Sequence, residues 1–395
     1  MEIYLDNAAT SYPKPECVYR AVEEFMRGVG ASAGRGGYRR ALEADRVVYA
    51  ARRAVSTLLG VEDPKRVVFT ANATASLNLA LKGLLGEGDV VITSSWEHNA
   101  VWRTLKWLER ARGVQVRVVP PGGAGPFDLT VFREWLRERP RLVVVTGASN
   151  VTGVLLPVPE IGELCRVQGV PLLLDAAQTA GAVPVDVAEL GVCLLAFTGH
   201  KGLLGPQGTG GLYIGEGVEP EPLKHVGTGS ESAREDQPRS LPDRYEAGTL
   251  NVPGLAGLGA GVEFLLEQGV ERVGRREAEL AAHLAEGLRS IPGVAVYGHD
   301  GGPHVGVVSF NVEGVPCEEV AYVLDRVYGI MVRAGLHCAP CAHRVLGTLA
   351  TGTVRASFGY YSGESDVSAL LEAVREIAGR VRGGGGLGQG LRGGG

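Results

Sequence analysis

The chain has 395 residues, of which 45% are hydrophobic, and this is enough for a large core and for two domains. Its 39 Lys and Arg residues against 44 Asp and Glu residues give a net charge of -5, with no basic run that would follow a phosphate backbone. No apolar run reaches the length of a membrane span, and the N-terminus is acidic. We therefore expect a cytoplasmic protein that binds neither nucleic acid nor membrane.

Seven short apolar runs alternate with helical patterns in the first half of the chain, as is typical of βαβ units. Most runs are apolar at consecutive positions, which indicates strands that are covered on both faces. The sequence therefore predicts an α/β fold with a buried, mainly parallel seven-stranded sheet. The predicted strands cover residues 66–70, 89–93, 114–119, 142–146, 170–175, 194–198 and 209–214.

The pattern changes after a polar stretch at residues 227–242. A long helical segment, a strand at 305–312 and a helix at 317–327 follow, and they indicate a smaller α+β domain. We place the large domain at residues 15–261 and the small domain at residues 1–14 and 262–382. Residues 383–395 are rich in glycine, cannot bury a core, and are predicted to form a disordered tail.

A lysine and an aspartate follow two of the predicted strands. Lys201 lies in a glycine-rich loop after strand 194–198, and Asp175 ends strand 170–175. Either residue alone has an ordinary interpretation, as a surface lysine or as a hydrogen-bonded structural carboxylate. Ligands of α/β proteins bind at such strand ends. Pyridoxal 5'-phosphate (PLP) requires both a lysine for its Schiff base and a carboxylate for its pyridine nitrogen. Together, the two residues favour a PLP site.

The segment Thr70–Asn78 predicts a strand followed directly by a helix, and the N-terminus of such a helix can bind a phosphate. An ordinary capped helix fits the segment equally well.

Motifs spread along the chain, from Tyr4-Leu-Asp-Asn-Ala-Ala-Thr to Thr353-Val-Arg-Ala-Ser, resemble one family in content and order. It is the family of class V aminotransferase-like cysteine desulfurases and selenocysteine lyases, which are fold type I PLP-dependent transferases. The short loop that carries Cys338 is similar to that of the group II desulfurases.

This resemblance implies a role for each residue of the cofactor site. Lys201 resembles the Schiff-base lysine, Asp175 the partner of the pyridine nitrogen, and Gln178 the donor to the phenolic oxygen. His98 resembles a histidine that stacks on the cofactor ring and could move protons. A lone histidine is otherwise more often structural.

The resemblance also implies the phosphate ligands. Thr74, Thr198 and His200 match ligands from the same subunit, and Thr249 matches one supplied by the other subunit of a homodimer. Ala73 occupies a position where related enzymes often carry a second threonine, so one hydroxyl contact is expected to be missing.

Asn150 and Arg355 resemble the pair that holds the substrate carboxylate, a task suited to the two-pronged guanidinium. The alternative for Arg355 is a surface ion pair. Cys338 resembles the cysteine that takes sulfur from the substrate, which here would be L-cysteine or L-selenocysteine. Cys338 must attack as a thiolate, which positive charge on Arg333 or on a protonated His337 would favour.

Cys341 lies three residues after Cys338 and leaves three alternatives open. It is an ordinary loop cysteine, which we favour, or a resolving thiol that attacks a persulfide on Cys338, or a zinc ligand with His337 and His343. Zinc ranks third because it would occupy the attacking thiol, and we predict no metal site. The remaining cysteines, which we expect to be inert packing residues, are Cys17, Cys165, Cys193 and Cys317.

The resemblance predicts an enzyme that converts L-cysteine to L-alanine and places the sulfur on Cys338 as a persulfide. A sulfur-acceptor protein or a small thiol would then remove it for sulfur mobilisation, for example in iron–sulfur cluster assembly. The alternatives are a selenocysteine lyase, an aminotransferase or β-lyase in which Cys338 is incidental, and a non-catalytic protein that retains the cofactor fold.

Overall fold

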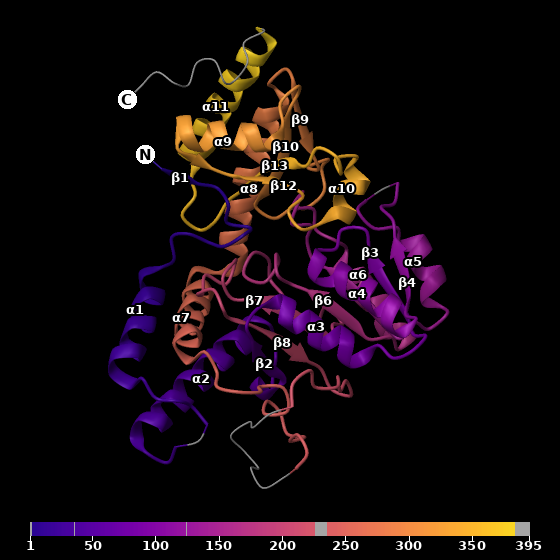
Figure 1. The fold of residues 1–395 in the computed structure, drawn as a ribbon, viewed down its shortest axis with the longest axis vertical. Helices are drawn as coiled ribbons and strands as arrows, with labels where there is room; N and C mark the ends of the chain where they lie inside the picture. The colour runs from indigo at the N-terminus through magenta and orange to yellow at the C-terminus, as the bar shows by residue number, and fades with distance from the viewer. Residues whose placement is uncertain (1, 35, 124, 226–234, 384–395) are drawn as a thin grey trace.

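The structure is a computed structural model and describes residues 2–34, 36–123, 125–225 and 235–383. Figure 1 shows a larger lower part built around one sheet and a smaller upper part built around another, with α8 (Val270–Arg289) rising from the first into the second. The active-site candidates lie between these two parts.

The large sheet has the strand order β2-β8-β7-β6-β5-β3-β4. Only β8 runs antiparallel to its neighbours, β2 and β7. All seven predicted strands are present within one or two residues, so the predicted mainly parallel sheet is confirmed. The strands are β2 (Val67–Thr70), β3 (Val90–Ser94), β4 (Gln115–Val119), β5 (Leu142–Thr146), β6 (Leu172–Asp175), β7 (Leu194–Thr198) and β8 (Gly210–Ile214).

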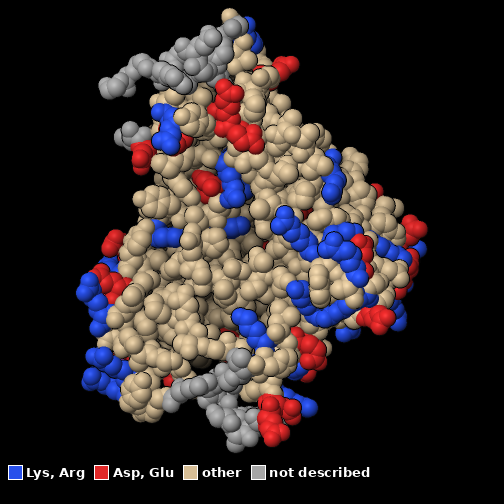
Figure 2. All heavy atoms as spheres, in the orientation of Figure 1, with Lys and Arg blue, Asp and Glu red and all other residues tan. Residues whose placement is uncertain are grey.

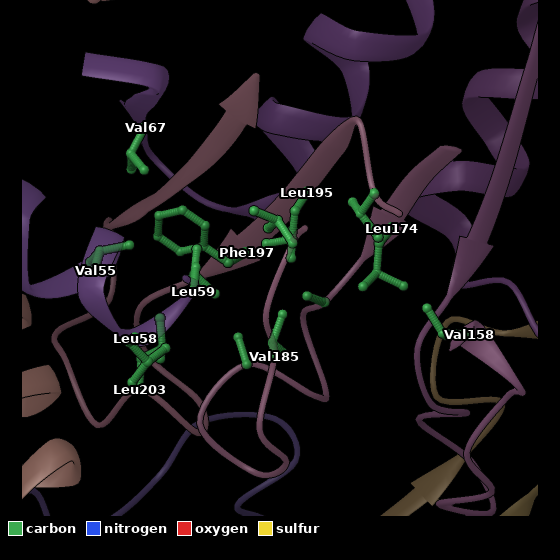
Figure 3. Close-up of a cluster of buried hydrophobic side chains, with 14 of the residues drawn as sticks. Val55, Leu58, Leu59, Val67, Val158, Leu174, Val185, Leu195, Phe197 and Leu203 are labelled. Atoms are coloured by element: carbon green, nitrogen blue, oxygen red, sulfur yellow. The ribbon is translucent and has the colours of Figure 1, made fainter. Parts of the chain in front are cut away.

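Two apolar clusters cover the two faces of this sheet, because successive side chains of a strand point to opposite faces. In β7, Leu195 and Phe197 join one cluster, whereas Leu194 and Ala196 join the other. Figure 3 shows the first cluster, in which Phe197 lies close to side chains from α2. Helices α2 (Arg39–Leu58), α5 (Leu129–Leu136), α6 (Val158–Gln168) and α7 (Val252–Gln268) contribute to that cluster, and α3 (Ala73–Leu84) and α4 (Asn99–Arg112) to the other.

The smaller part contains a four-stranded antiparallel sheet in the order β12-β13-β10-β9. A separate core unites it with α8 and two further helices. The predicted strand at 305–312 and helix at 317–327 are both found, as β10 and α9. The elements are β9 (Val294–Tyr297), β10 (Val307–Val312), α9 (Cys317–Tyr328), β12 (Arg333–Gly335), α10 (Pro340–Leu346), β13 (Thr353–Ser357) and α11 (Glu364–Arg382).

The N-terminal residues join this smaller part, because β1 (Ile3–Tyr4) pairs in parallel with β11 (Ile330–Met331). The chain then passes through α1 (Glu16–Glu24), a π-helical turn at Phe25–Val29 and, after α2, a 3-10 turn at Pro64–Arg66. The domain boundary expected at residue 261 falls inside α7, whose Leu265 still packs in the large core. The division into two domains therefore stays a prediction.

Most of the predicted tail, residues 384–395, and part of the polar stretch, residues 226–234, lie outside the described residues. Within the described part of the chain, every helix is too short or too polar to cross a membrane.

Candidate active site

Lys201 and Asp175 lie at the carboxyl edge of adjacent parallel strands. Asp175 is the last residue of β6 and pairs in register with Ala196 of β7, and Lys201 follows β7 by three residues. The Asp175 carboxylate accepts a 3.0 Å hydrogen bond from the Ala177 N–H. The positive charge of Lys201 also reaches it. The loop geometry that the sequence suggested is therefore present.

Burial governs the charge of both groups. Burial, followed by the charge of Arg355, lowers the pKa of Lys201 from 10.5 to about 8, although Asp175 opposes the shift. Burial also raises the pKa of Asp175, against the effects of the Ala177 hydrogen bond and of Lys201. The amine is thus a far better nucleophile and base at neutral pH than a surface lysine is.

His98 precedes α4 and caps its N-terminus. Its Nδ1 accepts a 3.0 Å hydrogen bond from the Ala100 N–H, so the neutral ring carries its proton on Nε2. Burial, followed by the charge of Lys201, lowers the pKa of His98 to about 4. The ring therefore faces the lysine as a neutral group, which suits stacking on another ring.

Unpaired polar atoms gather near this lysine. The hydroxyl of Thr198 and the Nδ1 atom of His200 are buried and have no hydrogen-bond partner among the described residues. Thr74 is exposed in the first turn of α3. The Asn72 side chain caps this helix by accepting from the Ala75 N–H, so the first amides of the helix remain available to an anion.

Thr249 is exposed and lines a cavity of about 300 Å³ together with Thr70 and Asn78. The neighbouring Glu246 anchors this segment, because its carboxylate forms a buried ion pair with Arg52 at 2.6 Å. The contribution of Thr249 to the other subunit's site stays a prediction, since the structure holds one chain.

Arg355 and Asn150 are brought together at the junction of the two parts. Arg355 lies on β13 with only 2% of its surface exposed, and it donates a 2.9 Å hydrogen bond to the Asn150 carbonyl oxygen. It also forms a 2.7 Å ion pair with Asp6. The Arg355 Nε and the Asn150 Oδ1 are buried and unpaired. The surface ion pair considered for Arg355 is wrong, because the guanidinium is buried.

The Gln178 side chain already has one hydrogen-bond partner in the N-terminal segment. Its Nε2 donates a 3.2 Å hydrogen bond to the Ala8 carbonyl oxygen, which leaves its second N–H.

Cys338 is exposed on a loop with an unusual backbone. Both His337 (φ 48°) and Cys338 (φ 58°) adopt the left-handed conformation, which costs about 1 to 3 kcal/mol for each non-glycine residue. Two hydrogen bonds hold the loop in place. The Asn150 amide donates to the His337 carbonyl oxygen at 2.6 Å, and the Asn99 N–H donates to the Cys338 carbonyl oxygen at 2.7 Å. The backbone that carries the thiol is thus held beside Asn150 and the start of α4.

A protonated His337 cannot supply the charge that we considered for Cys338. Burial, followed by the charge of Arg355, lowers the pKa of His337 to about 2, and its Nε2 lies 3.0 Å from the Thr353 carbonyl oxygen. This idea is wrong, because the ring is buried beside a cation and stays neutral. Positive charge near the thiol comes instead from Arg355, which interacts electrostatically with Cys338.

Cys341 is buried in α10 and is 5% exposed. Arg344 donates a 3.4 Å hydrogen bond to its sulfur, but burial still raises its pKa. The His343 ring is engaged with Thr348 at 2.7 Å. Among the described residues, no three His, Cys, Asp or Glu side chains are grouped to hold a metal. The remaining cysteines are buried (Cys165, Cys317) or half-buried (Cys17, Cys193).

Three residues near the site were not predicted from the sequence. Asp6 pairs with Arg355, as described above, and Lys14 donates to the His200 carbonyl oxygen at 2.9 Å, with burial lowering its pKa to about 8. Glu97 is fully buried directly before His98, and burial raises its pKa to about 8. Asp6 lies inside the motif Tyr4-Leu-Asp-Asn-Ala-Ala-Thr that resembles the family, and Glu97 directly precedes His98, which are the signals that could have found them.

Comparison with known proteins agrees with this fold and arrangement. The family Aminotransferase class-V matches residues 3–370. A probable cysteine desulfurase of Methanothermobacter thermautotrophicus is 38% identical over 384 residues, covering 95% of each chain. A cysteine desulfurase of Haloferax volcanii is 32% identical, covering 94% of this chain and 88% of the relative.

Solved structures give the same result. The apo cysteine desulfurase of Thermococcus onnurineus NA1 superposes with a TM-score of 0.86 at 34% identity, covering 96% of this chain and 95% of the other. The cysteine desulfurase CsdA of Escherichia coli also has a TM-score of 0.86, at 31% identity and the same coverage.

The fold is that of the PLP fold type I proteins. The chain belongs to the class-V aminotransferase family, and the relatives named above carry the name cysteine desulfurase.

Proposed function

We propose that the protein is a PLP-dependent cysteine desulfurase, which converts L-cysteine to L-alanine and receives the sulfur on Cys338 as a persulfide. The observation that carries the proposal is the juxtaposition of a buried, weakly basic Lys201 with Asp175 and with a thiol fixed on a strained loop. Full-length relatives named cysteine desulfurase support it.

The side chains fit PLP. A cationic ring nitrogen would pair with the buried Asp175 carboxylate, and phosphate oxygens would satisfy the unpaired Thr198 hydroxyl and His200 nitrogen. Thr74 and the first amides of α3, next to Ala73, would complete the phosphate site. When bound, PLP supplies an electron-accepting ring that stabilises negative charge on the substrate Cα.

The chain itself supplies binding and proton transfer. Arg355 orients the substrate carboxylate through its unpaired Nε–H, and Asn150 through the second N–H of its amide, whose first N–H donates to the His337 carbonyl oxygen. Lys201 removes the Cα proton and holds it on Nζ, because its lowered pKa leaves part of the amine neutral at pH 7. The neutral His98 ring would stack on the cofactor, and Gln178 would donate a hydrogen bond to its phenolic oxygen.

Cys338 performs the step that separates this reaction from transamination. Its thiolate attacks the sulfur of the bound cysteine, a sulfur–sulfur bond forms, and the carbon–sulfur bond of the substrate breaks. The three-carbon fragment then takes up one proton at Cβ, regains one at Cα from Lys201, and leaves as alanine. In a homodimer, Thr249 of each subunit would reach the phosphate of the other. A small thiol or an acceptor protein would empty Cys338.

Alanine release tests this proposal. The purified protein with PLP should form alanine from L-cysteine, and L-selenocysteine and cysteine sulfinate compared alongside will rank the substrates. The Lys201→Ala variant should lose the visible absorption band of covalently attached PLP. A protein that forms no alanine from L-cysteine, or a Lys201→Ala variant that keeps this band, would overturn the proposal.

A further inference from the structure

The N-terminal segment crosses the junction between the two parts of the molecule and carries one carboxylate to the substrate site. Figure 1 shows the chain passing from β1 in the upper part to α1 in the lower part. Between these elements, Asp6 forms an isolated parallel β-bridge with Ser357, the last residue of β13. Arg355 of the same strand donates from Nη2 to the Asp6 carboxylate at 2.7 Å. Local backbone pairing therefore holds this carboxylate beside the guanidinium.

The Asp6 carboxylate occupies a position that the substrate carboxylate would use. The Arg355 Nη1 atom donates to the Asn150 carbonyl oxygen at 2.9 Å, Nη2 donates to Asp6, and Nε is buried and unpaired. Carboxylates favour two parallel hydrogen bonds from a guanidinium, and Nε with the neighbouring Nη2 offers such a pair. Because Asp6 accepts from Nη2, it competes with the substrate for this geometry.

The two members of this ion pair differ in burial. The Arg355 side chain is 2% exposed, whereas that of Asp6 is 22% exposed. A guanidinium as buried as this one is strongly destabilising when it is left without a counter-ion. A carboxylate that already meets solvent loses less when it moves away. Asp6 is therefore the member of the pair that can be exchanged.

A second guanidinium lies next to the first. Arg333 of β12 is the cross-strand partner of Arg355, and side chains at such opposite positions project from the same face of a sheet. Arg333 is exposed and forms no salt bridge within the described residues. Its charge reaches Tyr4, whose hydroxyl donates to the Asp6 carbonyl oxygen at 3.3 Å. A displaced Asp6 carboxylate thus has another cation nearby.

The surroundings of the junction are also basic. Figure 2 shows that Lys and Arg side chains prevail over Asp and Glu side chains on the visible face where the two parts of Figure 1 meet. An incoming carboxylate is attracted to such a surface.

We propose that Asp6 is an exchangeable counter-ion of Arg355 that sets the affinity of the site for α-carboxylates. In the empty site, its carboxylate neutralises the guanidinium. When an amino acid binds, the ligand carboxylate accepts from the Arg355 Nε and Nη2 atoms, and the Asp6 carboxylate moves to Arg333. When alanine leaves, Asp6 returns to Arg355. Asp6 thereby weakens substrate binding and favours product release. This inference rests on the proposed function, in which Arg355 binds the substrate carboxylate.

The affinity for L-alanine tests the exchange. L-Alanine is titrated into the PLP-loaded enzyme, and binding is followed by the visible absorption of the cofactor. The Asp6→Asn variant keeps the size of the side chain and removes its charge. It should bind L-alanine at least about 10-fold more tightly than the parent, because the ligand no longer competes with a carboxylate. L-Alaninamide, which lacks the carboxylate, should gain no affinity.

Three further variants separate charge from structure. Asp6→Glu keeps the carboxylate and should bind L-alanine as the parent does. Arg333→Gln should weaken L-alanine binding in the parent, because the displaced carboxylate loses its new partner, and should have little effect in the Asp6→Asn background. Glu216→Gln is the control for net charge, because it removes one carboxylate from an exposed ion pair with Arg66, and it should leave the affinity unchanged.

A structure of the PLP-loaded parent with bound L-alanine tests the exchange without any variant. The Asp6 Oδ1 atom, which lies 2.7 Å from the Arg355 Nη2 atom in the empty site, should move beyond about 3.5 Å. The carboxylate of the ligand should take its place. An Asp6 carboxylate that still accepts from Nη2 beside the bound ligand would overturn the inference.

Three binding results would also overturn the inference and leave the proposed function intact. In the first, Asp6→Asn folds and takes up PLP but binds L-alanine no more tightly than the parent, as a purely structural ion pair predicts. In the second, L-alaninamide gains affinity too, or Asp6→Glu gains as much as Asp6→Asn. In the third, Arg333→Gln has equal effects in both backgrounds, so that Arg333 does not receive Asp6. A parent that forms no alanine from L-cysteine would instead overturn the proposed function.

Discussion

The Asn99 N–H donates a 2.7 Å hydrogen bond to the carbonyl oxygen of Cys338, so the candidate sulfur acceptor is tied to the first residue of α4. The preceding residue, His98, caps the same helix. One helix terminus therefore positions both the ring that faces Lys201 and the backbone of the attacking thiol.

The Asn99→Pro substitution removes this single N–H. Proline is favoured at the first position of a helix, and His98 already has the extended backbone that a following proline requires (φ -67°, ψ 155°). We expect normal folding and a 5- to 10-fold slower formation of the Cys338 persulfide, at about 1 kcal/mol for the lost hydrogen bond. Single-turnover kinetics will measure the rate of persulfide formation. The control is Asn99→Ala, which keeps the N–H. Equal rates in the two variants would show that the bond is unimportant.

The low pKa of Lys201 predicts how PLP attachment depends on pH. Only the neutral amine attacks the aldehyde, so attachment to the cofactor-free protein should accelerate as pH rises through about 8 and then level off. Absorption of the attached cofactor, followed from about pH 6.5 to 9.5, will measure the rate. Lys14→Met is the control, because burial also lowers the pKa of Lys14 to about 8. An attachment rate that does not change with pH in the parent would contradict the assignment of Lys201. A rate that loses its pH dependence only in Lys14→Met would contradict it as well.

The lowered pKa of Lys201 also affects the stability of the cofactor-free protein. The folded amine loses its proton near pH 8, whereas the unfolded chain keeps it up to about 10.5. The unfolded state therefore binds more protons between these values, and the free energy of unfolding of the cofactor-free protein should rise with pH across this range. Lys201→Met should reduce that rise.

The ion pair between Arg52 and Glu246 anchors the segment that carries Thr249. Both side chains are 6% exposed, and the Glu246 carboxylate also accepts a 2.6 Å hydrogen bond from the Phe69 N–H. Replacing Glu246 by Ala leaves a buried guanidinium unpaired, so unfolding should require about 3 to 5 kcal/mol less. Denaturant unfolding will measure this loss.

Glu216→Ala is the matched control, because Glu216 pairs with Arg66 through a side chain that is 88% exposed. Its effect should stay below about 1 kcal/mol. Similar losses in the two variants would mean that the Arg52–Glu246 pair is not a specific anchor.

The sequence predicts features that depend on neighbouring residues, and it does not predict contacts between residues far apart in the chain. Consecutive apolar residues predict the seven buried strands, and the chemistry of strand ends places Lys201 near Asp175. The ion pair between Asp6 and Arg355 joins residues 349 positions apart, and no local pattern reports it. The neutral state of His337 depends on its burial beside Arg355, which the sequence of the loop does not contain.

Cys341 should have no part in turnover. Its sulfur is buried, and burial raises its pKa although Arg344 donates a hydrogen bond to it, so it is poorly placed to form the thiolate that a resolving role requires. Cys341→Ala should release alanine at the parent rate and accumulate the same amount of persulfide. A disulfide between Cys338 and Cys341 in the parent after turnover, found by mass spectrometry, would instead identify a resolving thiol.

The central claim is that Cys338 receives the sulfur of L-cysteine. The most direct measurement is one turnover of the PLP-loaded enzyme with L-cysteine and no added thiol, followed by alanine quantification and mass spectrometry of the Cys338 peptide. We predict alanine in equal amount to a peptide heavier by one sulfur atom, and no burst of alanine from Cys338→Ala. An unmodified Cys338 peptide alongside a full turnover of alanine, or a Cys338→Ala variant as fast as the parent, would contradict the claim.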